Sequence, residues 1–129
     1  MYYFLKLTKD MTIERIEMED YDWESLAKLI NCDYIEQASI SRLKTTPKLC
    51  FIVDEEGALK SDREINSLAS SLYGRVLFGD VLIAHEGFNE YGYLDIMPLS
   101  ETMAANLFDM FTHVLREVKG DLGELQDNV

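Results

Sequence analysis

Short runs of apolar residues recur along most of the chain and predict β-strands. The clearest are an aromatic and aliphatic run at 2–7, five consecutive apolar residues at 49–53, and a run at 76–85, where Gly79 and Asp80 predict a bulge or a bend. Weaker patterns predict further strands within residues 11–18, 34–40 and 93–97, the last returning antiparallel.

Three consecutive acids and a glycine, Asp54 to Gly57, follow the strand pattern at 49–53. An aspartate can hydrogen-bond its own backbone, and glycine adopts positive φ without steric cost, so this composition is typical of a tight turn. We expect a short return strand at 58–60 after the turn. Adjacent solvated acids are a poor environment for paired-carboxylate catalysis, which needs one carboxyl group in an apolar site.

Apolar residues at helical spacing predict a first helix, with Asp20 or Asp22 available as its N-cap. Its stripe consists of Trp23, Leu26, Ala27 and Ile30 at positions i, i+3, i+4 and i+7. This spacing places Trp23 on the buried face, so we expect its side chain in the core.

Two further helices are predicted towards the C-terminus. An apolar stripe within 65–72 follows Ser61 or Asp62 as the expected N-cap and ends at Gly74. A longer amphipathic helix begins after Ser100 as its cap, keeps the 3.6-residue period over four turns, and is expected to end at Gly120.

The mixture of strands and helices lacks strict βαβ alternation. It predicts an α+β fold with a mostly antiparallel sheet, two to three helices packed on it, and a long C-terminal amphipathic helix. The chain has 129 residues, 47% of them hydrophobic, and no flexible linker. We therefore expect one domain over residues 1–120 and a frayed polar tail over 121–129.

Charge is the strongest global feature of the composition. The chain carries 24 acids against 12 bases, a net charge of −12, and its isoelectric point is about 4.4. Such a polyanion is repelled by nucleic-acid phosphates and by anionic membrane surfaces, so direct binding to either is not expected. The charge favours a basic protein partner, including one that itself binds DNA; ordinary solubility is the alternative explanation.

The expected compartment is the cytoplasm. No apolar run approaches the roughly 20 residues of a membrane span. The N-terminus has no basic region and no small-residue cleavage site, so we interpret it as a strand rather than a signal peptide.

Residues that often carry chemistry do not form a recognisable motif. Cys32 and Cys50 are not in a CxxC and are expected to be reduced thiols, with Cys50 in the core. His113 is expected to be a partly buried structural histidine. His85 lies at the end of a strand and is the better placed of the two to act as a ligand. No metal-ligand spacing, phosphate-binding loop or nucleophile elbow is present, so no metal or cofactor is predicted and a non-enzymatic role is favoured, with enzymatic activity left open.

Two stretches combine acids with aromatic residues and predict a surface for a protein partner. The candidate residues are Glu17, Glu19, Asp20, Tyr21, Asp22, Glu24, Glu86, Phe88, Glu90 and Tyr91. Phe88 and Tyr91 lie in a glycine-rich stretch and are not easily assigned to the core.

A second hypothesis is a binding domain for a small molecule or nucleotide. It requires a concave apolar pocket with convergent polar groups, for which Asn66, Arg75, Asp80 and His85 are the candidates. A third alternative is a homodimer formed through the C-terminal helix or an exposed strand edge.

Residues 21–85 resemble an uncharacterised family of small domains found in phages, plasmids and conjugative elements, mostly of Gram-positive gut bacteria. The resemblance depends on the acid-acid-glycine turn at 55–57, on Asn66, and on the Gly79-Asp80-Val81 strand. The family usually has a proline shortly before its asparagine, whereas this chain has Asp62-Arg63-Glu64-Ile65 there. The resemblance implies a mobile-element setting and no reaction.

The leading hypothesis is therefore a small acidic cytosolic protein of a mobile element that acts by binding another protein. In its sharper form, the acidic face imitates DNA towards a host DNA-binding protein, in an anti-defence or regulatory role. Strong salt dependence of binding would be its signature.

Overall fold

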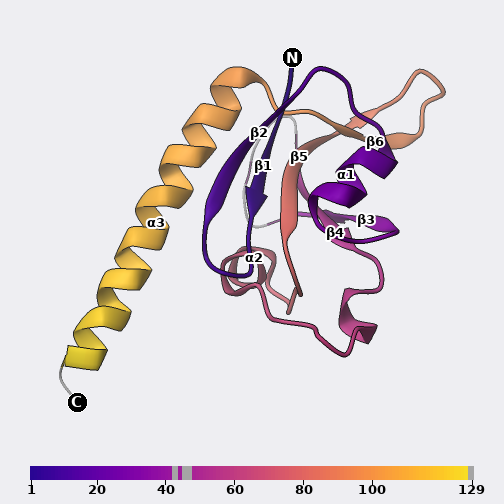
Figure 1. Cartoon of the computed structure of the whole chain (residues 1–129). Helices are drawn as coiled ribbons and strands as arrows, with labels where there is room; N and C mark the ends of the chain where they lie inside the picture. Colours follow the sequence, from indigo (N-terminus) through magenta and orange to yellow (C-terminus); the bar gives the residue numbers. More distant parts are fainter. Residues whose placement is uncertain (42–43, 45–47, 128–129) are drawn as a thin grey trace.

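A six-stranded antiparallel sheet forms the centre of the molecule (Figure 1). The computed structural model describes the backbone of residues 1–41, 44 and 48–127, and side chains as far as residue 117. The strands are β1 (Tyr2–Leu7), β2 (Ile13–Met18), β3 (Ile35–Ser39), β4 (Leu49–Asp54), β5 (Val81–Phe88) and β6 (Leu94–Met97). Their order is β2-β1-β5-β4-β3, with β6 also paired to β5.

The long strand β5 organises the sheet. One of its edges pairs with β4, through partners such as Cys50 and Ala84. The opposite edge pairs with β1 at residues 81–83 and with β6 at residues 85–88. The β5–β6 hairpin therefore continues the sheet beyond the start of β1, where Leu99 bridges to Tyr3.

Helices cover both faces of the sheet, as Figure 1 shows. On one face, α1 (Trp23–Leu29) packs Leu26 and Ala27 against a cluster that includes Phe4 and Leu82. On the other face lie α2 (Ser67–Tyr73) and α3 (Glu101–Asp127). Alternate residues of each strand belong to one or the other of these two buried clusters, because successive side chains of a strand point to opposite faces. The predicted α+β class, with a long C-terminal helix, is confirmed.

The acidic turn after β4 leads into a short 3₁₀ helix, η1 (Gly57–Leu59). The turn itself is confirmed, since Asp54 Oδ1 accepts a hydrogen bond of 2.9 Å from the backbone N–H of Glu56. The expected return strand at 58–60 was wrong. Both edges of β4 are already occupied by β3 and β5, so no edge remained for it.

The second helix begins later than the periodicity predicts. Asn66, not Ser61 or Asp62, is the N-cap of α2, and Ile65 lies outside the helix, bridged to Phe78. Gly74 ends the helix in the left-handed conformation at φ 91°, as expected.

Strand β5 begins at Val81, so the first five residues of the predicted strand at 76–85 are not in it. Gly79 has φ 75° and turns the chain into β5, in agreement with the predicted bend. The strand continues past His85 to Phe88, because β6 supplies a partner for each residue from 85 to 88.

The cap of α3 is confirmed, since Ser100 Oγ accepts a hydrogen bond of 3.1 Å from the backbone N–H of Met103. The predicted end at Gly120 was wrong, because the backbone stays helical to Asp127. A glycine inside a helix costs only about 1 kcal/mol relative to alanine and does not by itself end it.

Candidate functional site

The β5–β6 hairpin protrudes from the body of the molecule (Figure 1). It presents aromatic side chains to solvent. Phe88 is 75% exposed, Tyr91 is 76% exposed, and Tyr93 and Leu94 are also exposed. The turn is nevertheless ordered, because Asn89 Oδ1 accepts hydrogen bonds from the backbone N–H groups of Tyr91 and Tyr93, at 3.0 and 3.1 Å. The aromatic groups are thus held outward on a defined backbone.

Exposed acids gather on the connection between β2 and α1. Glu19 and Asp20 are exposed, and Asp22 caps α1 by accepting a hydrogen bond of 2.7 Å from the backbone N–H of Ser25. The backbone and side-chain hydrogen bonds from Ser25 lower the pKa of Asp22, so the carboxylate is the favoured form. This part of the surface therefore keeps its negative charge to low pH.

Tyr21 joins these two regions of the chain. Its hydroxyl group donates a long hydrogen bond of 3.5 Å to the carbonyl oxygen of Ile96 on β6, and its ring makes edge contacts with Tyr2 and Phe4. Burial raises the pKa of Tyr21, and the nearby carboxylate of Asp95 raises it further. The β2–α1 connection and β6 are therefore side by side.

Neither region contains a lysine or an arginine. Residues 17–24 and 86–97 together carry eight carboxylates. Two of these are balanced by cations from outside, since Glu17 pairs with Arg15 at 3.5 Å and Glu24 pairs with Lys28 at 3.7 Å. We name as the acidic–aromatic surface Glu19, Asp20, Tyr21, Asp22, Phe88, Glu90, Tyr91, Tyr93 and Asp95.

Glu86, another of the candidate surface residues, is less exposed than the acids named above. It is half-buried on the α1 face of the sheet, where its carboxylate accepts a hydrogen bond from the Ser39 hydroxyl group. Tyr93 was not among the candidate surface residues, but it lies directly before β6 and is exposed, as is Leu94. Its position after a glycine turn, beside acids and other aromatic residues, was the available signal.

Trp23 corrects a prediction. Its side chain is 50% exposed rather than in the core. It occupies the first position of α1, and the later members of the stripe, Leu26, Ala27 and Ile30, reach the buried cluster. His113 likewise is not partly buried: its side chain is 74% exposed, and its Nε2 lies 3.1 Å from Glu117 Oε1 one turn along α3.

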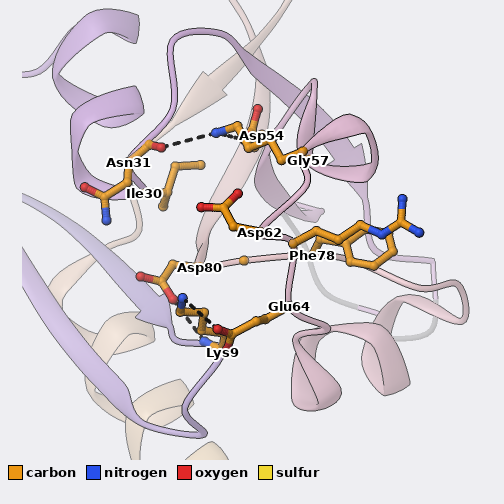
Figure 2. Close-up of a pocket in the computed structure, with 12 residues that line it drawn as sticks. Lys9, Ile30, Asn31, Asp54, Gly57, Asp62, Glu64, Phe78 and Asp80 are labelled. Atoms are coloured by element: carbon orange, nitrogen blue, oxygen red, sulfur yellow. Dashed lines mark hydrogen bonds and ion pairs between the residues drawn. The ribbon is translucent and has the colours of Figure 1, made fainter.

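A small polar pocket lies where β1 and β4 end and β5 begins (Figure 2). Its volume is about 120 Å³, well below the roughly 300–1,000 Å³ of pockets for drug-sized ligands. Its charged groups bind one another. Lys60 Nζ lies 2.6 Å from Asp54 Oδ2, and Lys9 Nζ lies 3.5 Å from Glu64 Oε1.

The four residues predicted to form a ligand pocket do not line one common cavity. Asp80 lines the pocket of Figure 2, where its Oδ1 accepts a hydrogen bond of 2.9 Å from the backbone N–H of Lys9. Asn66 is adjacent but buried, and it hydrogen-bonds the backbone. Arg75 lines a separate open depression beside the end of α2, and His85 is buried on β5, five residues beyond Asp80.

The two cysteines are free thiols, with Cys50 buried as expected. Burial is the main cause that raises the pKa of Cys50 to about 12 and that of Cys32 to about 11. Over the described side chains, no group of three or more His, Cys, Asp or Glu residues is arranged to hold a metal ion.

Comparison with known proteins gives no further guide, because no family model, curated protein or solved structure matches the chain. No helix within the described part of the chain has the length and apolar character needed to cross a membrane.

Proposed function

We propose that this protein binds a basic protein partner through the acidic–aromatic surface. The proposal depends on one observation: Tyr21 holds together residues 17–24 and residues 86–97, two segments that contain no lysine or arginine. The exposed aromatic side chains of the hairpin lie beside them. Exposed aromatic side chains supply contact area, and unbalanced carboxylates speed the encounter with a basic partner. A partner that normally binds DNA would meet the same charge requirement, and a mobile element is the setting that the family resemblance implies.

The hairpin suits this role because its aromatic side chains are exposed without being flexible. Ordering a loop on binding costs free energy, whereas the Asn89 hydrogen bonds hold this turn before a partner arrives. The exposed tyrosines offer both apolar area and a hydroxyl group, a combination that is enriched at protein interfaces.

The test is affinity capture from a nuclease-treated bacterial extract, with elution from about 0.1 M to about 1 M salt. Over this range the Debye length falls from about 10 Å to about 3 Å, so complexes held by exposed charges are released. The surface variant is Glu19→Gln/Asp20→Asn/Glu90→Gln. Its matched control, Asp10→Asn/Glu56→Gln/Asp109→Asn, removes three exposed carboxylates elsewhere.

We expect basic proteins to bind the natural chain and the control variant, to elute with salt, and to be lost from the surface variant. Capture of the same proteins by the surface variant would refute the proposal. So would a partner that stays bound at the highest salt concentration.

A further inference from the structure

Among the residues that the structure describes, β3 has no strand on its outer edge and ends the sheet. Backbone hydrogen bonds from Ile40 N to Leu49 O and from Glu55 N to Tyr34 O, both 3.0 Å, flank its ladder with β4. Hydrogen-bonded pairs alternate in an antiparallel ladder, so the N–H and C=O groups of residues 35, 37 and 39 point away from β4.

Over its described residues 35–39, this edge has few of the features that normally prevent strand addition. Edge strands are usually protected by lysines, prolines, bulges or other charged residues. The opposite edge strand, β2, carries three charged side chains in six residues. β3 carries only Glu36, has no lysine or proline, and pairs with β4 in an uninterrupted register without a bulge.

A recess lies at the start of this edge, between the first turn of α1 and the ends of β3 and β4. It has a volume of about 350 Å³ and is lined by Trp23, Glu24, Asp33, Tyr34, Ile35 and Glu55. Trp23 is 50% exposed and Tyr34 is 62% exposed, so both aromatic side chains are accessible from it. We call this feature the Trp23–Tyr34 recess.

The negative charge of the recess favours binding of a cationic side chain. All three charged residues that line it are acids, and within the described part of the chain only Glu24 has an ion pair, with Lys28 at 3.7 Å. Aromatic faces attract ammonium and guanidinium groups, and neighbouring carboxylates add to that attraction. A lysine or arginine side chain therefore satisfies both the aromatic and the acidic groups of the recess.

We propose that an extended, lysine- or arginine-rich segment of a partner adds to β3 as a further strand and places one cationic side chain in the Trp23–Tyr34 recess. The side chain of Ile35 points to the α1 face of the sheet, the face of the recess. A partner residue opposite Ile35 would present its side chain to the same face. The inference rests on the proposed function in requiring a basic partner, but it uses a different part of the molecule.

Trp23 is the only tryptophan in the chain, so its fluorescence reports directly on the recess. The probe is the acetylated hexapeptide amide Thr-Lys-Thr-Lys-Thr-Lys. One control peptide has glutamate for lysine. Another carries an N-methyl group on the backbone nitrogen of its second lysine; when a lysine lies opposite Ile35 in an antiparallel pairing, the lysine N–H groups face β3, so this change removes a donor and keeps the charge. We expect a saturable change in Trp23 emission with the lysine peptide alone, together with slowed hydrogen exchange at the amides of residues 35, 37 and 39.

Two pairs of matched variants locate the contact. Tyr34→Ala and Glu55→Gln should each weaken binding about fivefold, the loss expected for an exposed cation–aromatic or charge contact. Val76→Ala and Asp109→Asn, which alter exposed residues outside both the recess and the acidic–aromatic surface, should leave peptide binding unchanged.

Several results would overturn the inference. These are equal binding of the glutamate or N-methylated peptide, no binding at all, or binding that both Tyr34→Ala and Glu55→Gln leave unchanged. A dimer in sedimentation whose β3 amides are already protected would show that a second copy occupies the edge. None of these results bears on salt-dependent capture through the acidic–aromatic surface, so the two proposals fail separately.

Discussion

The side-chain amide of Asn66 donates a hydrogen bond of 3.0 Å to the carbonyl oxygen of Leu7, 59 residues earlier in the chain. It donates a second, of 2.9 Å, to the carbonyl oxygen of Gly79. Its Oδ1 accepts a hydrogen bond of 3.1 Å from the backbone N–H of Ala69, which caps α2. One fully buried side chain therefore joins the end of β1, the start of α2 and the entry to β5.

Replacement of Asn66 by alanine should lower the free energy of unfolding by about 3 kcal/mol. Loss of a helix cap costs about 1 kcal/mol, and carbonyl groups left buried without a donor cost about 1–3 kcal/mol. Urea denaturation measures the change. Ser100→Ala, which removes the exposed cap of α3, is the matched control and should cost about 1 kcal/mol. Equal losses in the two variants would show that the long-range bonds of Asn66 contribute nothing.

The same residue shows what a sequence pattern can predict and what it cannot. The ends of α2 differ: Gly74 was predicted because glycine at a helix end is a local signal. Asn66 was not predicted as the cap, because its selection depends on Leu7 and Gly79, which are distant in sequence. Local signals also located the six strands and the cap of α1, whereas the pairing partners of β4 excluded a return strand for a reason visible only in three dimensions.

The exposure of the candidate surface residues could likewise be predicted from the sequence only in part. The exposure of Phe88 and Tyr91 followed from their glycine-rich surroundings, and the structure agrees. The exposure of Trp23 was not predictable, because helical spacing shows which residues share a face and not how far the opposing sheet extends. The recess beside β3 could not be predicted at all, since it forms from three segments that meet only in the fold.

Gly87 on β5 lies close to the side chain of Met97 on β6, which a larger residue at position 87 would displace. A Cβ atom at Gly87 would lie 2.6 Å from Met97 Cγ. Gly87→Ala should therefore lower the free energy of unfolding by about 1–2 kcal/mol. The second substitution Met97→Ala in the same chain should restore part of that loss, because it removes the clashing atom.

Gly57→Ala is the matched control for this test. A Cβ atom at the buried Gly57 would meet its nearest neighbour at 3.6 Å, an ordinary contact, so we expect little change. If Met97→Ala fails to improve the stability of Gly87→Ala, as measured by urea denaturation, the close approach of the two strands is not the cause of the loss.

Both thiols should react slowly in the folded protein. With the pKa of Cys32 raised to about 11, only about one thiol in a thousand is the reactive thiolate at pH 8, and Cys50 has a pKa of about 12 and is buried as well. We expect a thiol reagent at pH 8 to label Cys32 slowly and Cys50 only after unfolding. Cys32→Ser and Cys50→Ser variants identify which thiol has reacted. Rapid labelling of either residue in the folded chain would contradict the buried, protonated state.

His85 should make stability depend on pH below about 7. Its Nε2 atom is enclosed and has no hydrogen-bond partner among the residues that the structure describes, and burial lowers its pKa from the usual value of 6.5. The unfolded chain therefore binds a proton at a pH where the folded chain does not. The contribution of neutral His85 to stability is complete above about pH 7. It is lost as the pH falls below the pKa of His85 in the unfolded chain and towards its lower pKa in the folded chain.

The slope of this loss cannot exceed about 1.4 kcal/mol per pH unit for one histidine. Carboxylates such as Asp22, whose pKa is lowered from 3.8, lose their contribution only at lower pH, so the two effects occupy separate windows. The chain has only two histidines, which allows a clean comparison of unfolding free energies from pH 5 to pH 7. His85→Leu should flatten the pH dependence, whereas His113→Gln, at an exposed site, should leave it unchanged. A natural chain whose stability is constant over this range would show that His85 is protonated as readily in the fold as outside it.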